Sequence, residues 1–312
     1  MEDYPKTIAE FENKFTTEEA CREYLLNLRW PNGFVCPRCQ SRQSWLTKRG
    51  LLVCYSCEYQ VSIKAGTIFQ DSRKPLKTWF RAIWWVTSQK TGASALGLQR
   101  VLGLGSYQTA WTWLHKLRRA MVRPGRDRLT GEVEIDETYI GGEKSGKRGR
   151  GAEGKSLVLI IVQKDAERIG RIRLRRVEDA SARSLKPAIK EATEPTTKIY
   201  TDDWLGYSGL KNLGYRHKIV RDSASIGENL LPLAHRVSSL LKRWLMGTHQ
   251  GAVSHEHLDY YLDEFTFRFN RRTSQYRGKL FYRLVQQAVS VEPSPYRAIV
   301  RSAKKDKLRK HN

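Results

Sequence analysis

Residues 36–57 read CPRCQSRQSWLTKRGLLVCYSC, and four of the five cysteines in the chain lie in this stretch. They form two C-x2-C pairs, Cys36 with Cys39 and Cys54 with Cys57, separated by fourteen residues. Two such pairs bring four thiolates into a tetrahedral shell, which is how proteins hold structural zinc. The alternatives are two disulfides, or one redox pair beside an unrelated second pair, and a reducing cytosol disfavours disulfides. The stretch therefore predicts four cysteine ligands to Zn2+.

The residues between the two pairs predict the shape of this zinc site. Two short apolar segments, 45–48 and 51–53, flank Arg49-Gly50, which is typical of a β-hairpin. A helix is predicted just before, over 16–28, and carries the fifth cysteine. We therefore predict a zinc ribbon with a preceding helix over residues 17–72.

From residue 73 to residue 124 the sequence changes to helical periodicity that is rich in tryptophan. Helices are predicted over 76–85, 94–102 and 106–121, with Ser106 as an N-cap after the turn at 103–105. Helix, short glycine-containing turn and helix is the outline of a helix-turn-helix. We predict a helical DNA-binding region, with the tryptophans packed in its core.

Beyond a break at residues 123–126 the pattern alternates between strands and helices. The pattern predicts strands over 133–136, 157–162, 169–175 and 198–201, and helices over 182–192, 232–246 and 255–269. Strands first and helices later favour a mixed sheet covered by helices, over residues 131–290. The fold class is therefore α+β and multidomain. A glycine- and lysine-rich loop at 141–151 is either a solvated linker or a basic arm, and residues 291–312 are predicted to be a basic tail.

The charge of the chain indicates its partners. The 312 residues carry 56 Lys+Arg against 32 Asp+Glu, a formal net charge of +24. Such a field favours a polyanion, and nucleic acid gains counterion release from every contact with a basic side chain. The longest clean apolar run, 157–162, is far too short to cross a membrane, and no secretory signal is visible. We expect a cytoplasmic, nucleoid-associated DNA-binding protein without a membrane partner.

Two aspartates follow predicted strands and are candidates for metal-dependent chemistry. Asp136 shares a strand face with Glu134 and Thr138, and Asp202 ends the strand 198–201. Carboxylates at the ends of adjacent strands bind hard divalent cations, which is the arrangement that cuts phosphodiesters. Taken singly, each is also an ordinary strand-end or helix-capping Asp, and the pattern does not separate Asp202 from Asp203.

The helix predicted after residue 231 carries the third candidate. Pro232 fits the first helical turn, so the helix is expected to begin there. His235 and Lys242 lie opposite the apolar stripe and are seven residues apart, which stacks them two turns from each other. His235 is therefore either simply exposed, or it faces a site from which Lys242 reaches a phosphate.

Four stretches in these regions carry a family resemblance: VEIDETYIGG at 133–142, TDDWLGY at 201–207, LLKR with GTH within 240–249, and YLDEF with FNRR within 261–272. Together with the cysteine pairs, the chain resembles prokaryotic insertion-sequence transposases that join an N-terminal zinc ribbon to a DDE-type, ISXO2-like core. The resemblance implies an RNase H-like catalytic fold, two divalent metals, Mg2+ or Mn2+, and cutting and transfer of DNA at terminal inverted repeats. It also implies a homodimer or larger synaptic assembly that holds the transposon ends and the target DNA.

The resemblance assigns catalytic roles to four residues. Asp136 matches the first acid of the family and Asp202 matches the second. Lys242 matches the lysine that follows the third ligand by seven residues, and counting back gives His235. Most DDE enzymes have Glu there, and this family often has Asn. Imidazole is softer than carboxylate and removes one negative charge, so we expect weaker Mg2+ retention and better use of Mn2+.

The third ligand and the activity of the chain leave alternatives open. Glu228 is the other candidate for the third ligand, but it precedes Pro232 and lies off the predicted helix. We expect a DNA transposase that uses two-metal in-line phosphoryl transfer. The alternatives are a DNA-binding regulator whose catalytic core has died, which His235 favours, and a structure-selective nuclease of the same fold.

Overall fold

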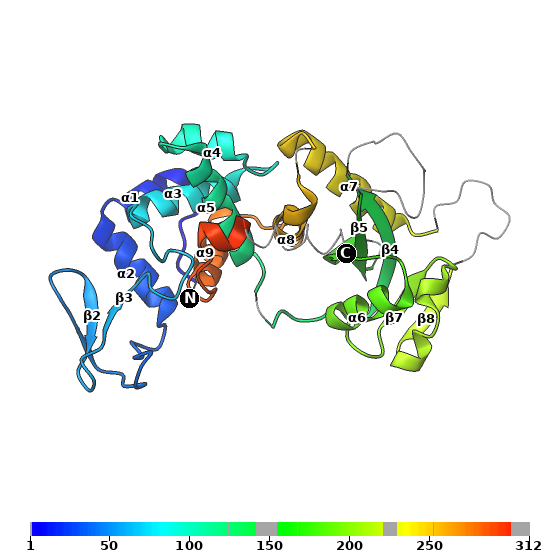
Figure 1. Cartoon of the computed structure of the whole chain (residues 1–312), viewed down its shortest axis with the longest axis horizontal. Coiled ribbons are helices and arrows are strands. Elements are labelled where there is room, and N and C mark those ends of the chain that lie inside the picture. Colours follow the sequence, from blue (N-terminus) through cyan, green and yellow to red (C-terminus); the bar gives the residue numbers. More distant parts are fainter. Residues whose placement is uncertain are drawn as a thin grey trace. The chain divides into compact units, whose positions relative to one another are not determined.

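The structure is a computed structural model of the chain. It describes residues 2–123, 125–141, 155–166, 168–220, 230–251 and 253–300. Within it the chain divides into two compact units, one formed by Met1–Arg123 with Thr273–Ser302 and the other by Pro124–Arg272 with Ala303–Asn312 (Figure 1). The predicted glycine-rich loop from residue 142 onward, Glu228 and residues 301–312 lie outside the described residues.

The first unit contains the zinc ribbon and a helical bundle. Its three-stranded antiparallel sheet has the order β1-β2-β3. The strands are β1 (Ser44–Leu46), β2 (Leu51–Cys54) and β3 (Gln60–Ser62). The helices are α1 (Ile8–Lys14), α2 (Glu18–Arg29), α3 (Leu76–Ser88), α4 (Ala95–Leu102), α5 (Tyr107–Ala120) and α9 (Arg277–Ala288).

Aromatic side chains form the core of the bundle. The ring of Phe281 on α9 lies 5.4 Å from Phe11, 5.6 Å from Phe15 and 5.6 Å from Phe80. Such edge-to-face and tilted contacts favour the ring quadrupoles and remove large apolar areas from water. Trp79, Trp84 and Trp113 are buried in this core, as predicted, whereas Trp85 and Trp111 are only partly buried.

The predicted helix-turn-helix outline is present in the first unit. The Ser106 side chain accepts a hydrogen bond from the Thr109 backbone N–H at 3.1 Å, so it caps α5 as predicted. Gly103 ends α4 with φ +59°, a left-handed conformation that suits glycine. Lys116 and Arg118 are buried against the bundle, so these two basic residues of α5 do not contribute charge to its exposed face.

The second unit is a five-stranded mixed sheet with the order β6-β5-β4-β7-β8. The strands are β4 (Glu132–Ile140), β5 (Ser156–Asp165), β6 (Arg168–Val177), β7 (Lys198–Thr201) and β8 (Arg216–Ile219). The helices are α6 (Ala182–Ala192), α7 (Pro232–His249) and α8 (Leu258–Phe269), with short 3-10 turns at Leu205–Tyr207, Lys211–Leu213 and His255–His257. The first three strands pair antiparallel, and β4, β7 and β8 pair in parallel. This is the RNase H-like mixed sheet that was predicted.

Helices cover both faces of this sheet (Figure 1). Alternate residues of β5, such as Val158 and Ile160, pack against α7 and α8 on one face. Leu159 and Ile161 point the other way and pack with α6 on the second face. Because β5 is buried on both faces, its sequence is a continuous apolar run rather than an alternating one. The sheet is therefore the middle layer between two helical layers.

The FNRR stretch at 269–272 covers part of one edge of the sheet. Strand β6 lies at this edge, where unpaired backbone groups favour pairing with another chain. The Asn270 side chain accepts a hydrogen bond from the Ile172 N–H at 2.7 Å and donates one to the Ile172 carbonyl at 3.1 Å. Arg272 donates to the carbonyl oxygens of Ile169 and Gly170. These side chains protect the edge from another strand.

The C-terminal boundary differs from the predicted limits of 131–290 and 291–312. The described residues of the second unit end at Arg272, and α9 packs in the first unit through Phe281. Residues 296–300 are helical, and Val291 and Ile299 are buried in that unit. The sequence shows that α9 is amphipathic, but it does not show which of two cores receives its apolar face.

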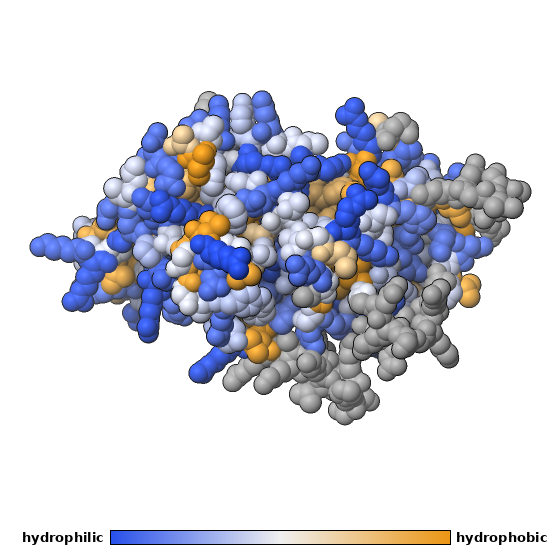
Figure 2. Space-filling view, turned by 90° about the horizontal axis from the view of Figure 1, so that it is seen from above, coloured by the Kyte–Doolittle hydropathy of each residue, from blue (hydrophilic) through white to orange (hydrophobic). Residues whose placement is uncertain are grey.

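The surface is largely hydrophilic on the face drawn in Figure 2, with small apolar patches between the charged side chains. Among the described residues, no helix has the length and apolar character that crossing a bilayer demands. Both observations agree with a chain of high net charge.

Candidate catalytic site and zinc centre

The four cysteines of the two C-x2-C pairs converge at one end of the ribbon. Their sulfur atoms all lie within 4.8 Å of one another, with Cys36 Sγ 3.7 Å from Cys57 Sγ and Cys39 Sγ 3.5 Å from Cys54 Sγ. A disulfide needs about 2.0 Å, whereas sulfurs 2.3 Å from a tetrahedral zinc are about 3.8 Å apart. The cysteines are free thiols, so the geometry fits structural zinc and excludes the disulfide alternative.

One face of β4 is the main support of the candidate catalytic site. Three alternate residues, Glu134, Asp136 and Thr138, point toward α7, whereas Val133 and Ile135 are buried on the α6 side of the sheet. The period of two in a strand produces this division. The first turns of α7 therefore lie directly over the acidic face of β4.

Glu134 fixes the beginning of α7. One of its carboxylate oxygens accepts hydrogen bonds from the backbone N–H groups of Leu233 and Ala234, at 2.8 and 3.0 Å. The preceding residue, Leu231, supplies no side-chain cap, so Glu134 satisfies two orphan donors from outside the helix. Burial raises the pKa of Glu134, and the two N–H groups oppose that rise. Helix α7 begins at Pro232, as predicted.

Asp136 and His235 meet between β4 and α7. His235 Nε2 lies 3.3 Å from Asp136 Oδ2, and the side chains are 49% and 18% exposed, respectively. The imidazole is thus outside the apolar stripe of α7, as the helical pattern indicated, and it faces an acid. One turn further along, Ser238 donates to Thr138 Oγ1 at 3.1 Å and holds the same two elements together.

The environment of Asp136 is dominated by burial and by other acids. The pKa of Asp136 is raised to about 6. Burial is the main cause and the negative charges of Glu137 and Asp202 add to it, whereas His235 and the Glu137 N–H oppose the rise. An acid that resists ionisation beside two further carboxylates is typical of a site that binds cations. The structure thereby brings Asp136 into electrostatic contact with Asp202.

Asp202 lies just beyond β7, the strand that pairs in parallel with β4. Its Oδ1 accepts a hydrogen bond from the Trp204 N–H at 3.1 Å, and its side chain is half-buried. Asp203 is exposed. The sequence could not separate these two aspartates. In the structure Asp202 is the partly buried one of the two, and its charge acts on Asp136.

Lys242 is exposed on α7, and a rise of about 1.5 Å per residue places it roughly 10 Å along the helix from His235. It does not join the cluster of Asp136 and His235, but it lies on the same helix at the spacing the sequence indicated. Glu228, the other candidate third ligand, lies outside the described residues.

Two residues of the site were not anticipated from the sequence. Tyr207, buried in the α6 layer, donates a hydrogen bond to the Glu137 carboxylate. Burial and the negative charge of Glu137 raise the pKa of Tyr207 far above its usual range, so it stays a donor. Glu137 and Tyr207 both belong to the stretches that carry the family resemblance, which was the available signal.

The two candidate metal sites differ in how fully they are assembled. Across the described parts of the chain, the cysteines are the one group of three or more ligand-type side chains gathered closely enough to share an ion. Asp136, Asp202 and His235 are not gathered to that degree. The two carboxylates nevertheless offer hard oxygen donors that suit Mg2+ or Mn2+, and the imidazole adds a softer nitrogen donor. The acidic environment of Asp136 also fits a divalent cation.

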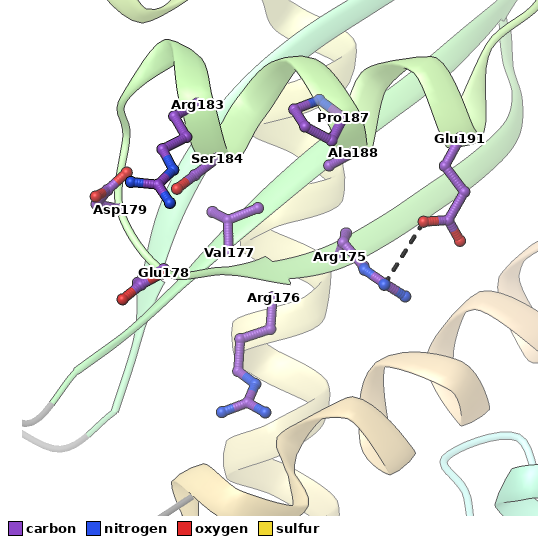
Figure 3. A pocket seen from close by; sticks show the side chains of 10 residues that line it. All are labelled: Arg175, Arg176, Val177, Glu178, Asp179, Arg183, Ser184, Pro187, Ala188 and Glu191. Atoms are coloured by element: carbon purple, nitrogen blue, oxygen red, sulfur yellow. Dashed lines mark ion pairs between the residues drawn. The ribbon is translucent and has the colours of Figure 1, made fainter. Parts of the chain in front are cut away.

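A separate pocket of about 530 Å³ lies between β6 and α6 (Figure 3). It contains Arg175, Arg176 and Arg183, but also three carboxylates, and Arg175 pairs with Glu191 at 3.5 Å. None of the candidate catalytic residues lines it. Its balanced charge gives no preference for an anion.

Comparisons with known proteins agree with this geometry. The profile of the ISXO2-like transposase domain matches residues 128–270, and that of the transposase zinc-ribbon domain matches residues 16–60. The chain is therefore similar to ISXO2-like insertion-sequence transposases in both its zinc ribbon and its mixed-sheet unit. A protein in the transposable element ISH50 of Halobacterium salinarum is 26% identical over 278 residues, which is 81% of this chain and 91% of that protein.

Solved structures with detectable similarity are more distant. A chain of a simian T-cell lymphotropic virus intasome is 18% identical, with a TM-score of 0.32, over 59% of this transposase and 70% of that chain. The Mos1 transposase, in a paired-end complex with the left transposon end, is 15% identical with a TM-score of 0.30. That match covers 76% of this chain and 82% of the Mos1 chain.

Proposed function

We propose that this transposase cuts DNA at the ends of an insertion sequence and joins the freed ends to target DNA. The observation that carries the proposal is the contact of Asp136 with His235, next to the strand that ends at Asp202. Divalent metal bound by these three side chains would activate water for the first cut and the 3′-hydroxyl for strand transfer.

Some residues of the site would bind the metal, and others would position those ligands or the DNA. Asp136 and Asp202 supply hard oxygen donors, and His235 supplies a neutral nitrogen through Nε2, the atom that faces Asp136. Glu134 holds the beginning of α7 and thereby keeps the imidazole over β4. Lys242, exposed on the same helix, would neutralise a phosphate of the bound strand.

DNA is the proposed partner because of the charge of the chain, +24. The zinc ribbon and the α4–α5 pair would read the terminal inverted repeats, and exposed basic side chains would hold the backbone. Synapsis of two ends would need a homodimer or larger assembly. The DNA-reading role of these elements and the assembly of subunits are both inferred from the similarity to the family.

A strand-cleavage assay with Mg2+ or Mn2+, on DNA that carries the repeats flanking the gene, tests the proposal. Asp202→Asn should abolish cleavage, whereas Asp203→Asn, its exposed neighbour, should retain it. Equal activity of Asp202→Asn and the unmodified protein would contradict the assignment. Cleavage that ignores the terminal repeats would indicate a structure-selective nuclease.

The alternative function is a DNA-binding regulator with a dead catalytic core. One observation favours it: His235 stands where related enzymes carry Asn or Glu. The regulator predicts repeat-specific DNA binding with no cleavage in either metal. Cleavage in Mn2+ that depends on Asp136 would exclude it.

A further inference from the structure

The outer face of the zinc ribbon carries exposed aromatic rings. Trp45 on β1 is 39% exposed, and Tyr55, which follows β2, is 61% exposed. Their ring centroids are 4.7 Å apart, with the planes tilted by 52°. Large aromatic side chains in mutual contact on a small, polar domain are unusual unless they bind something.

The register of the ribbon explains why these rings lie together. Trp45 pairs with Val53, and the Tyr55 N–H donates to the Gln43 carbonyl at 3.1 Å, which extends the β1–β2 ladder. Alternation along the two strands therefore places Trp45, Val53 and Tyr55 on one face. We call this surface, formed by Trp45 and Tyr55 over Val53, the aromatic face.

The core of the ribbon does not need these rings. It lies on the opposite face and consists of Phe34, Cys36, Leu52, Cys54 and Val61. Trp45 covers Val53, which is buried, but Tyr55 remains mostly exposed. Much of the aromatic area is thus left in water, and it is available to a ligand.

The charges around the aromatic face select the kind of ligand. Residues 31–63 contain four basic side chains and one acid, Glu58. The basic residues are all exposed: Arg38, Arg42, Lys48 and Arg49. None of these four forms an ion pair with any residue the structure describes. Exposed cations and exposed aromatic rings in one small domain are the combination that binds single-stranded nucleic acid.

We propose that the aromatic face binds unpaired bases of single-stranded DNA. Trp45 and Tyr55 stack on bases, while the neighbouring guanidinium and ammonium groups bind the phosphates. Duplex DNA is a poorer ligand, because its bases already stack on one another. The inference deepens the proposed action on DNA, and it assigns a base-binding site to the ribbon, outside the catalytic unit.

Oligonucleotides with and without bases test the inference. Binding of the full chain to a fluorescent thymidine oligomer is measured by anisotropy, without divalent metal, against an abasic oligomer of equal length. Both ligands carry the same phosphates, so their affinity ratio isolates the contribution of stacking. We expect the unmodified protein to prefer the thymidine oligomer by about five- to 150-fold, the range for one stacked base.

Three variants assign the preference to the aromatic face. Tyr55→Ala, or Trp45→Ala with Tyr55→Ala, should lower the ratio toward one and leave abasic binding unchanged. Trp45→Phe should retain most of it. Leu46→Ala is the matched control, because Leu46 is 59% exposed and is the next residue of the same strand, on the opposite face. Zinc content of each variant checks that the ribbon remains folded.

An unchanged ratio in folded Tyr55→Ala and in the double variant would overturn the proposal, as would an unmodified protein that binds both oligomers equally. In that case a protein partner would be the better occupant of this face. Because no metal or cleavage enters the measurement, its failure is separate from a failure of Asp136 and Asp202 to support catalysis.

Discussion

The zinc ribbon and the proposed catalytic site arrange their candidate metal ligands in opposite ways. The ribbon gathers four sulfurs within 4.8 Å, and all four come from two short segments of one hairpin-bearing domain. The proposed catalytic site draws on β4, the end of β7 and α7, which are far apart in the sequence, and within the described part of the chain Asp136 and His235 lie in direct contact. A structural site is closed by its own chain, whereas a catalytic site must stay open to substrate.

The largest effect is expected from breaking the closed site. Cys36→Ser removes one of four zinc ligands, and zinc contributes about 10–16 kcal/mol to the folding of such domains. We expect loss of bound zinc and rapid hydrogen exchange over 31–63, with slow exchange retained in β4 and β5. Cys21→Ser, a buried cysteine outside the cluster, should keep the zinc. Stoichiometric zinc in folded Cys36→Ser would contradict the four-ligand assignment.

A substitution in the proposed catalytic site should affect cleavage rather than folding. Asp136→Asn removes a charge from the candidate metal site without changing the shape of the side chain. Cleavage should fall about 1,000-fold, the equivalent of about 4 kcal/mol at the barrier. DNA affinity should be retained, because the ribbon and the basic surface are intact. Lost affinity with retained cleavage would show that Asp136 binds DNA rather than metal.

Metal preference sharpens the comparison further. His235→Glu restores the carboxylate that most DDE enzymes carry, and a harder, negative ligand favours Mg2+. We expect the ratio of cleavage in Mg2+ to cleavage in Mn2+ to rise about tenfold. Arg236→Gln, which lowers the net charge by the same one unit at the next residue, is the control. An unchanged ratio in His235→Glu would indicate that His235 does not contact the metal.

Glu134, which supports the proposed catalytic site, should make a smaller contribution to the stability of the fold. Glu134→Ala removes the acceptor of two backbone N–H groups at the beginning of α7, which should lower the free energy of unfolding by about 2 kcal/mol. Glu132→Ala is the matched variant on the same strand, since Glu132 pairs with Lys198 at the surface. Urea denaturation should show the larger loss for Glu134→Ala. Equal losses of unfolding free energy in the two variants would show that Glu134 does not cap α7.

The smallest effect concerns pH. Burial raises the pKa of Asp263 on α8 to about 7, and Asp259 adds to the rise while Arg126 and Arg175 oppose it. A carboxyl group whose pKa is higher in the folded state stabilises the fold at low pH. That contribution to stability is lost as the pH rises through 7. Relative to the unmodified protein, Asp263→Asn should therefore gain about 1 kcal/mol of stability between pH 5 and pH 6. If the stability of Asp263→Asn relative to the unmodified protein rose as the pH was lowered, the predicted direction of this pH dependence would be wrong.

Much of the fold could be predicted because local signals decide it. Cysteine spacing defines the ribbon, Ser106 caps α5, and Pro232 begins α7, each through contacts within a few residues. Strand β5 was evident as an apolar run because both of its faces are buried. By contrast, β8 was missed because Arg216–Ile219 is a polar strand with little burial.

The supporting contacts of the site could not be predicted, since they depend on tertiary structure. Glu134 caps a helix about 100 residues away, and Tyr207 reaches Glu137 across 70 residues. Neither partner is visible in a local pattern. Likewise, the sequence around Phe281 does not show that α9 packs in the first unit rather than in the second. The family resemblance named the catalytic candidates, but only the structure shows what holds them.

Pulsed electron paramagnetic resonance of Mn2+ in the DNA complex tests the central claim most directly. If Asp136, Asp202 and His235 hold the metal, the spectrum should show 14N coupling from a directly bound imidazole. That coupling should disappear in His235→Asp, and bound Mn2+ should be lost in Asp136→Asn. Bound Mn2+ without 14N coupling, or coupling that persists in His235→Asp, would contradict the assignment.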